Sequence, residues 1–394
     1  MNLILYCYLF FNILVALSAF YTTPYLPNIN LSLAIFYQLQ AVLFVIAGWI
    51  IFSILPRRPS QGERIFEIIP NKKKLFSFLS YSFILSGLAS VIGQIYSSGS
   101  LGEYLLAVIT FNATSELREI YLTPSGEGGL PGVIKMFHIA PLAVYFVAAS
   151  LAQRETCNSS DRSFFRKHAI ISGLAILLKV FLVMDRISLI GLAVPLAHQT
   201  IRYLTFSRFL TMSPAFFIAY AALHYISESR LAGHGPFDFL LLYSKLGIVN
   251  LQIMLSSLEF HTYGFSTVLS PFIFVLNAFS LPAPATPMFE WEWNPAQFLT
   301  SYVFMDIGHF AFVAFFWIGL FLRWIEFKSK RAKFTSFYYA ATLTVITTFT
   351  VPFFRSVEFW LLLLIVYILG KSIGRERLMI CNTLSSNCDE RLHR

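Results

Sequence analysis

Charged residues are scarce in this chain of 394 residues, where Asp, Glu, Lys and Arg make up 12% of the sequence. Soluble domains carry about twice that share, so an ordinary soluble globular domain is excluded. No P-loop, GxGxxG, DxD-like motif or internal repeat occurs. Of the four cysteines, Cys381 and Cys388 lie near His393, but their spacing matches no standard zinc site. We therefore expect no metal and no other cofactor.

Apolar residues dominate instead, at 57% of the chain. Runs of about 20 apolar residues recur, and a helix of that length spans the ~30 Å hydrocarbon layer of a bilayer. Only helices and closed barrels satisfy their backbone groups in lipid, and runs without alternation favour helices. The sequence predicts an all-α, polytopic transmembrane helix bundle that forms a single integral-membrane domain over 1–394. The ten predicted spans are 2–21, 31–55, 75–96, 132–151, 169–184, 187–205, 209–227, 298–322, 335–351 and 357–370.

Basic residues orient this bundle, because most of the 29 Lys and Arg residues fall in alternate connections. The opposite side holds Arg118, Lys135, Arg186, Arg230, Lys245 and Arg355, and Lys179 lies inside a span. By the positive-inside rule, both termini are cytoplasmic. The connections 97–131 and 227–297 then face outward, and 371–394 is a cytoplasmic tail. The same rule accounts for the net charge of +9 without a nucleic-acid partner.

Three further expectations follow from this topology. No basic residue precedes the first span, which weighs against a cleaved signal peptide. All cysteines fall in the membrane or on the cytoplasmic side, so no outer disulfide is expected. The stretches 239–258 and 265–281 are apolar enough for two further spans, giving twelve. We favour short helices on the outer surface, because Lys245, Asn250 and Gln252 interrupt the first stretch.

Four arginines on the outer side are the main chemical signal: Arg118, Arg186, Arg230 and Arg355. Each falls at the edge of a span or in an outer connection, near the depth of the lipid headgroups. Guanidinium groups bind phosphate oxygens bidentately and keep their charge, so such a set suits a lipid-linked diphosphate. Structural alternatives exist: Arg186 beside Asp185, Arg118 beside Glu119, and Arg355 reaching toward the headgroups.

The large outer connection also gathers acids, bases and aromatic residues. Candidates for proton transfer are His234 and Asp238, followed by Glu228 and His261. Candidates for contact with a sugar are Tyr263, Trp291 and Trp293, with Asp306 at the next span. The alternative for the two tryptophans is an interfacial aromatic belt. A lone histidine on an apolar helix is more often structural, which we expect for His138, His224 and His309.

Several short pieces resemble one family of membrane enzymes. They are the segment around Arg118 with the turn Gly126–Gly132, Asp185-Arg186-Ile187-Ser188, Tyr243-Ser244-Lys245, Tyr263-Gly264-Phe265-Ser266-Thr267, and Asn294-Pro295 leading to Asp306-Ile307-Gly308 and Gly319. Their order over most of the chain resembles the oligosaccharide repeat-unit polymerases of bacterial surface polysaccharides, the Wzy-type O-antigen and capsule polymerases.

The resemblance implies a glycosyltransferase of the bacterial inner membrane whose active site faces the periplasm. Its partners would be an undecaprenyl-diphosphate-linked oligosaccharide donor and acceptor, membrane lipid and a chain-length regulator protein. In that interpretation, Arg118, Arg186, Arg230 and Arg355 bind diphosphate. Two alternatives stay open: an O-antigen ligase-like transferase, and a flippase or transporter for lipid-linked glycans, which predicts a polar track and inverted repeats.

Overall fold

The computed structural model describes most of the chain, namely residues 3–20, 29–55, 63–98, 102, 106, 132–154, 157–183, 185–202, 224, 236–258, 261–278, 281–282, 298–329, 332–348 and 353–379. These residues are predominantly helical, as the sequence predicts. The helices are α1 (Leu3–Ser18), α2 (Ser32–Ile54), α3 (Pro70–Ser98), α6 (Gly132–Met136), η1 (Phe137–Ile139), α7 (Ala140–Ala152), α8 (Ser159–Val183), α9 (Arg186–Arg202), α11 (Pro236–Ser257), α12 (Ser270–Ala278), α13 (Leu299–Ile307), η2 (Gly308–Phe310), α14 (Ala311–Ser329), α15 (Ala332–Thr347), η3 (Phe353–Arg355) and α16 (Val357–Ile373).

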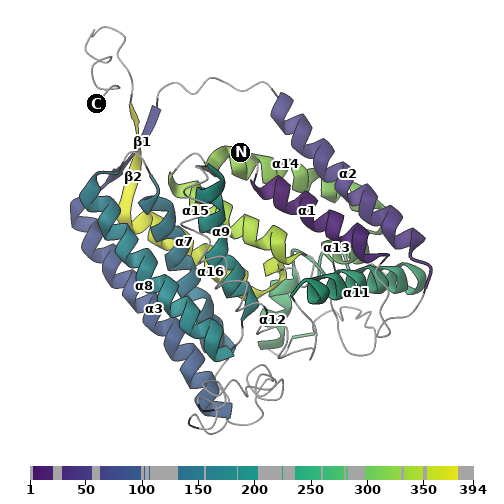
Figure 1. Cartoon of the computed structure of the whole chain (residues 1–394), viewed down its shortest axis with the longest axis horizontal. Coiled ribbons are helices and arrows are strands. Elements are labelled where there is room, and N and C mark those ends of the chain that lie inside the picture. Colours follow the sequence, from purple (N-terminus) through teal and green to yellow (C-terminus); the bar gives the residue numbers. More distant parts are fainter. Residues whose placement is uncertain are drawn as a thin grey trace.

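The helices form two groups joined by a central pair (Figure 1). One group contains α3, α7, α8 and α9, and the other contains α1, α2, α11 and α14. Between them, α15 packs on α14, α1, α9 and α7, and α16 packs on α7, α3 and α15. Among the described helices, α7 is the most enclosed, and every residue from Ala140 to Leu151 is buried. A helix that is apolar all round is expected in such a position.

Two glycines allow α2 and α14 to approach closely. A Cβ added at Gly319 would lie 2.1 Å from the Val45 carbonyl oxygen, and one at Gly48 would lie 2.1 Å from the Phe316 carbonyl oxygen. Small residues are what let helix backbones meet in membrane proteins, where van der Waals packing replaces the hydrophobic driving force. This contact sets the rotation of both helices about their axes.

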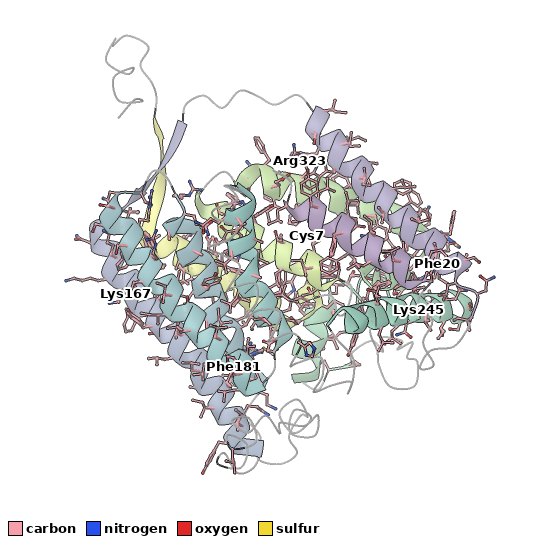
Figure 2. The ribbon with its side chains drawn as sticks, in the orientation of Figure 1. Cys7, Phe20, Lys167, Phe181, Lys245 and Arg323 are labelled. Carbon is pink, nitrogen blue, oxygen red and sulfur yellow. The ribbon has the colours of Figure 1, made fainter. Side chains whose placement is uncertain are left out.

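Four helical stretches among the described residues are long and apolar enough to cross a membrane: Ser32–Ile54, Asn71–Tyr96, Ile134–Ala152 and Leu299–Ser329. Leu3–Ser18 and Ile187–Thr200 are shorter apolar helices. The outward faces are also apolar; on α8, a stripe of Ile170, Leu174, Leu178 and Phe181 is 47–61% exposed. Figure 2 labels Phe181, the last residue of this stripe, near the end of α8. Such a contiguous apolar surface is compatible with embedding in lipid.

The predicted spans agree with the helices at 132–151 and 357–370, but α8 begins ten residues earlier than the predicted 169. Its first turns are polar and follow an Asn158 side chain that accepts the Asp161 N–H at 2.7 Å. Asp161 then pairs with Lys73 of α3. The span prediction follows apolarity, and so it detects the apolar part of this helix and misses the polar turns before it.

Two strands were not predicted. β1 (Glu63–Ile68) and β2 (Gly374–Met379) pair antiparallel, from Glu63 opposite Met379 to Ile68 opposite Gly374. The ribbon extends from one end of the bundle (Figure 1) and joins the connection after α2 to the beginning of the predicted tail. The all-α prediction therefore needs this correction, because pairing between segments some 300 residues apart leaves no local sequence signal.

The connection 227–297, which is predicted to face outward, also differs from the expected short helices, since α11 has 22 residues while α12 has 9. Two of the polar residues that interrupt the apolar sequence of α11 form hydrogen bonds to the ends of other helices. The Lys245 ammonium donates to the Ala19 carbonyl, just past α1, at 2.8 Å, and Figure 2 shows Lys245 near Phe20. The Gln252 Oε1 accepts the Ala34 N–H in the first turn of α2 at 3.0 Å. Thus α11 connects the end of α1 to the beginning of α2.

Candidate functional site

The first part of the candidate site is a loop held by Asp306 at the end of α13. The Asp306 carboxylate accepts hydrogen bonds from the Thr262 hydroxyl at 2.6 Å, the Ser266 N–H at 2.9 Å and the Thr267 hydroxyl. The backbone adds Thr262 N–H to the Met305 carbonyl at 2.8 Å. The structure thus joins two pieces that carried the family resemblance, 263–267 and 306–308. Asp306 itself is buried and fully bonded, which indicates that it positions the loop rather than contacting a substrate.

This loop presents two of the predicted site residues. Tyr263 adopts a φ of 47°, in the left-handed region that non-glycine residues seldom occupy, and its side chain is 79% exposed. The exposed His261 ring packs over Gly308, whose φ of 57° favours glycine, and a Cβ added at Gly308 would lie 2.6 Å from the His261 Cε1. Strained backbone persists where the surroundings hold it in place, and it clusters at functional sites. His261 and Tyr263 therefore project from a loop fixed by its hydrogen bonds.

Arg355, in η3 before α16, lies against α13, the helix whose last turn contains Asp306. Its guanidinium carbon is 3.6 Å from the centre of the Tyr302 ring. Burial lowers the pKa of Arg355 from its ordinary value, and Tyr302 and Asp306 act against that shift. The guanidinium remains charged in proteins. Its Nε is buried and has no hydrogen-bond partner among the described residues. A desolvated cation with an unused donor is suited to an anionic ligand.

A second cluster lies where α8 connects to α9. The Lys179 ammonium, buried within α8, is 2.5 Å from the Asp185 Oδ2 and donates to the Ser188 hydroxyl at 2.8 Å. That hydroxyl donates to the same carboxylate at 2.6 Å. Burial alone would raise the pKa of Asp185, but Lys179 and Ser188 hold it well below its usual range. The partner of Asp185 is therefore Lys179, and each charge of this ion pair is compensated by the other.

Glu358, in the first turn of α16, completes this cluster. Its Oε1 lies 3.1 Å from the Nε2 of His138 in η1, and 35% of its side chain is left uncovered. Lys179 and Asp185 act on Glu358 electrostatically. Glu358 was missed in the sequence analysis, and His138 was expected to be structural. The available signal was an acid at the edge of the last apolar run, because an ionisable group at membrane depth is a functional candidate by default.

No family model, curated protein or solved structure matches this chain.

The other predicted site residues have no described side chains. Arg186 begins α9 directly after Asp185, and Asp238 lies in the first turn of α11, with only the backbone described for each. His234, Glu228, Arg118, Arg230, Trp291 and Trp293 lie outside the described residues. The convergence of the four arginines therefore stays a prediction. Among the described residues, no group of three or more His, Cys, Asp or Glu is arranged to hold a metal ion.

Proposed function

We propose that this protein is a membrane glycosyltransferase that polymerises undecaprenyl-diphosphate-linked oligosaccharide repeat units, as the Wzy-type polymerases do. The resemblance of the ordered sequence pieces is one support. A second is that two of those pieces, 263–267 and 306–308, meet in the fold through Asp306, which interacts electrostatically with Arg355. The product would be O-antigen, capsule or exopolysaccharide, and the enzyme would lie in the bacterial inner membrane.

The proposal includes ten spans, cytoplasmic termini and an active site facing the periplasm. The position of α11 supports this arrangement. Consecutive spans such as α1 and α2 meet their connection at one membrane surface, and α11 binds both helices at that connection, through Lys245 and Gln252. A helix that bridges two such ends lies across them, as expected for a surface helix rather than an additional span.

In the proposed reaction, an acceptor hydroxyl oxygen attacks the anomeric carbon of the reducing-end sugar of the donor. The bond from that carbon to the diphosphate oxygen breaks, its electron pair leaves with undecaprenyl diphosphate, and the hydroxyl proton passes to a base. Arg355 neutralises the departing charge together with Arg118, Arg186 and Arg230. Preorganised cations aimed at developing charge are usually the largest contribution to catalysis. A chain-length regulator remains a proposed partner.

The observation that carries this proposal is the guanidinium of Arg355. It is stacked on Tyr302, and its Nε has no hydrogen-bond partner among the described residues. It also interacts electrostatically with Asp306, which holds the loop that projects His261 and Tyr263. Arg323 provides a contrast within the same chain. It also stacks on an aromatic ring, at 5.1 Å from the centre of Trp49, but its charge is paired with Glu326 at 2.5 Å.

The test uses the full-length protein in phosphatidylethanolamine–phosphatidylglycerol vesicles. The substrate is the undecaprenyl-linked glycolipid fraction from the host strain lacking this gene, and products are sized by gel electrophoresis and mass spectrometry. The wild type should lengthen the glycan in repeat-unit steps. R355A should lower the rate about 100-fold, R355K should recover little because it loses the bidentate fork, and R323A should retain activity.

Three results would count against the proposal. A wild-type protein that lengthens no glycan rejects the polymerase. Lengthening that is normal in R355A rejects the role of Arg355. Transfer of finished polymer to lipid A core, or movement of glycolipid across the bilayer without lengthening, replaces the polymerase with a ligase-like transferase or a flippase.

A further inference from the structure

The pattern Arg-x-x-Glu occurs at 64–67, 323–326 and 355–358. The structure uses two of these copies, 323–326 and 355–358, differently. In the first, Arg323 and Glu326 of α14 form an ion pair of 2.5 Å. In the second, Arg355 turns to Tyr302 and Glu358 turns to His138. Residues three apart at a helix terminus are close enough to pair. In the copy at 355–358, Arg355 and Glu358 instead contact separate partners.

In the hydrogen bond between His138 and Glu358, the imidazole is the donor and the carboxylate is the acceptor. The His138 Nδ1 is buried and has no partner among the described residues. A doubly protonated imidazole would leave the Nδ1–H buried without an acceptor, which costs free energy. A neutral imidazole that donates its Nε2–H to Glu358 avoids that cost. The His138 Nε2–H thus orients the Glu358 carboxylate. Part of the Glu358 side chain stays uncovered.

The neighbouring charges do not satisfy Glu358. The ionisable groups that act on it are His138 from η1, Lys179 from α8 and Asp185 from the connection to α9. Lys179 is already paired with Asp185 and bonded to Ser188. The Lys179–Asp185 pair has no net charge, so it does not compensate the negative charge of the Glu358 carboxylate. Glu358 does not cap α16 either. The N-cap is the Ser356 hydroxyl, which accepts the Phe359 N–H at 3.2 Å.

We propose that Glu358, oriented by His138, is the proton acceptor of the glycosyl transfer. This inference rests on the proposed polymerase function. The proton of the acceptor hydroxyl moves to the Glu358 carboxylate as the oxygen attacks the anomeric carbon, and the electron pair leaves with the diphosphate beside Arg355. One short segment, 355–358, would then supply both the charge that stabilises the leaving group and the base that activates the nucleophile. Glu358 takes the role first assigned to His234, Asp238, Glu228 or His261.

The decisive variant is E358Q, measured in the same vesicle assay, with E326Q as the matched control in the 323–326 copy of the pattern. General-base catalysis contributes about 100-fold or more, so E358Q should lower the lengthening rate by that factor while E326Q should not. Binding of undecaprenyl diphosphate, measured by native mass spectrometry, should be unchanged in E358Q and weakened in R355A. The rate of the wild type should fall as the pH drops and the carboxylate is protonated, and E358Q should lack that limb.

His138 is a positioning residue in this scheme, so H138Q should shift the acidic limb of the pH profile while retaining lengthening. If wild type lengthens glycan and E358Q does so at the same rate, the inference fails while the proposed function stands. It also fails if H261Q loses lengthening while E358Q remains active. If E358Q does not fold, E358D provides the test: unchanged lengthening with the displaced carboxylate overturns the inference, and slower lengthening with unchanged diphosphate binding supports it.

Discussion

Breaking the Lys179–Asp185 pair should destabilise the bundle severely, and D185N isolates that effect. The side chain of Lys179 is only 2% uncovered. Asp185 also accepts the N–H groups of Ile187 at 3.0 Å and Ser188 at 3.4 Å in the first turn of α9. Asparagine caps a helix as well as aspartate does. The variant therefore keeps the cap and leaves the Lys179 ammonium buried without its carboxylate.

Removing one partner of a buried pair costs about 3–5 kcal/mol, and we expect D185N to lose that amount of unfolding free energy. The measurement is unfolding by sodium dodecyl sulfate in mixed micelles, followed by far-ultraviolet circular dichroism. The double variant K179M/D185N should recover most of the loss, because no charge remains buried. D161N is the comparison variant, because the Lys73 side chain is 28% uncovered against 2% for Lys179. The ammonium left without its carboxylate is then better hydrated, so D161N should cost less than D185N. A D185N cost as small as that of D161N would refute the reasoning.

The pair also predicts a dependence of stability on pH. The folded-state pKa of Asp185 lies below its unfolded value of about 3.9. Stability from the pair is therefore complete above that unfolded pKa and is lost as the pH falls toward the folded pKa. The same micelle titration at successively lower pH should show a decline in the wild type that is absent from K179M/D185N. An equal decline in both proteins would assign the acid sensitivity to other groups.

Three further variants test the packing around the site. D306N should cost about 2 kcal/mol, because an amide cannot accept from the Thr262 and Thr267 hydroxyls together, and hydrogen exchange should quicken in 262–267. G319A should destabilise by about 1–3 kcal/mol through overpacking against Val45; G370A, which meets nothing within 4 Å, should cost nothing in the same titration. K245M should cost about 1.5 kcal/mol through loss of the charged bond to the Ala19 carbonyl, and quicker exchange at the end of α1 should accompany it.

Much of the helical layout was readable from the sequence, because the free energy of placing a segment in lipid depends on local apolarity. The predicted span 132–151 corresponds to Gly132–Ala152, and 357–370 corresponds to the apolar part of α16. Polar parts of helices and long-range strand pairing escaped the same reasoning. The early start of α8 depends on an Asn158 cap, and the ribbon depends on β1 meeting β2. Neither signal lies in a window of apolar residues.

The candidate site divides in the same way. Residue type alone selected Arg355, His261, Tyr263 and Asp306, since guanidinium, imidazole, aromatic and carboxyl groups are conspicuous in an apolar chain. Tertiary structure decides which of these side chains already have hydrogen-bonding partners and which are left to bind a ligand. Asp306 is fully bonded, whereas Glu358 and Arg355 turn away from each other to different partners. The reason is physical: apolarity determines that a helix forms, but its rotation about its own axis is set by contacts such as Gly319 against Val45. That rotation decides which side chains meet.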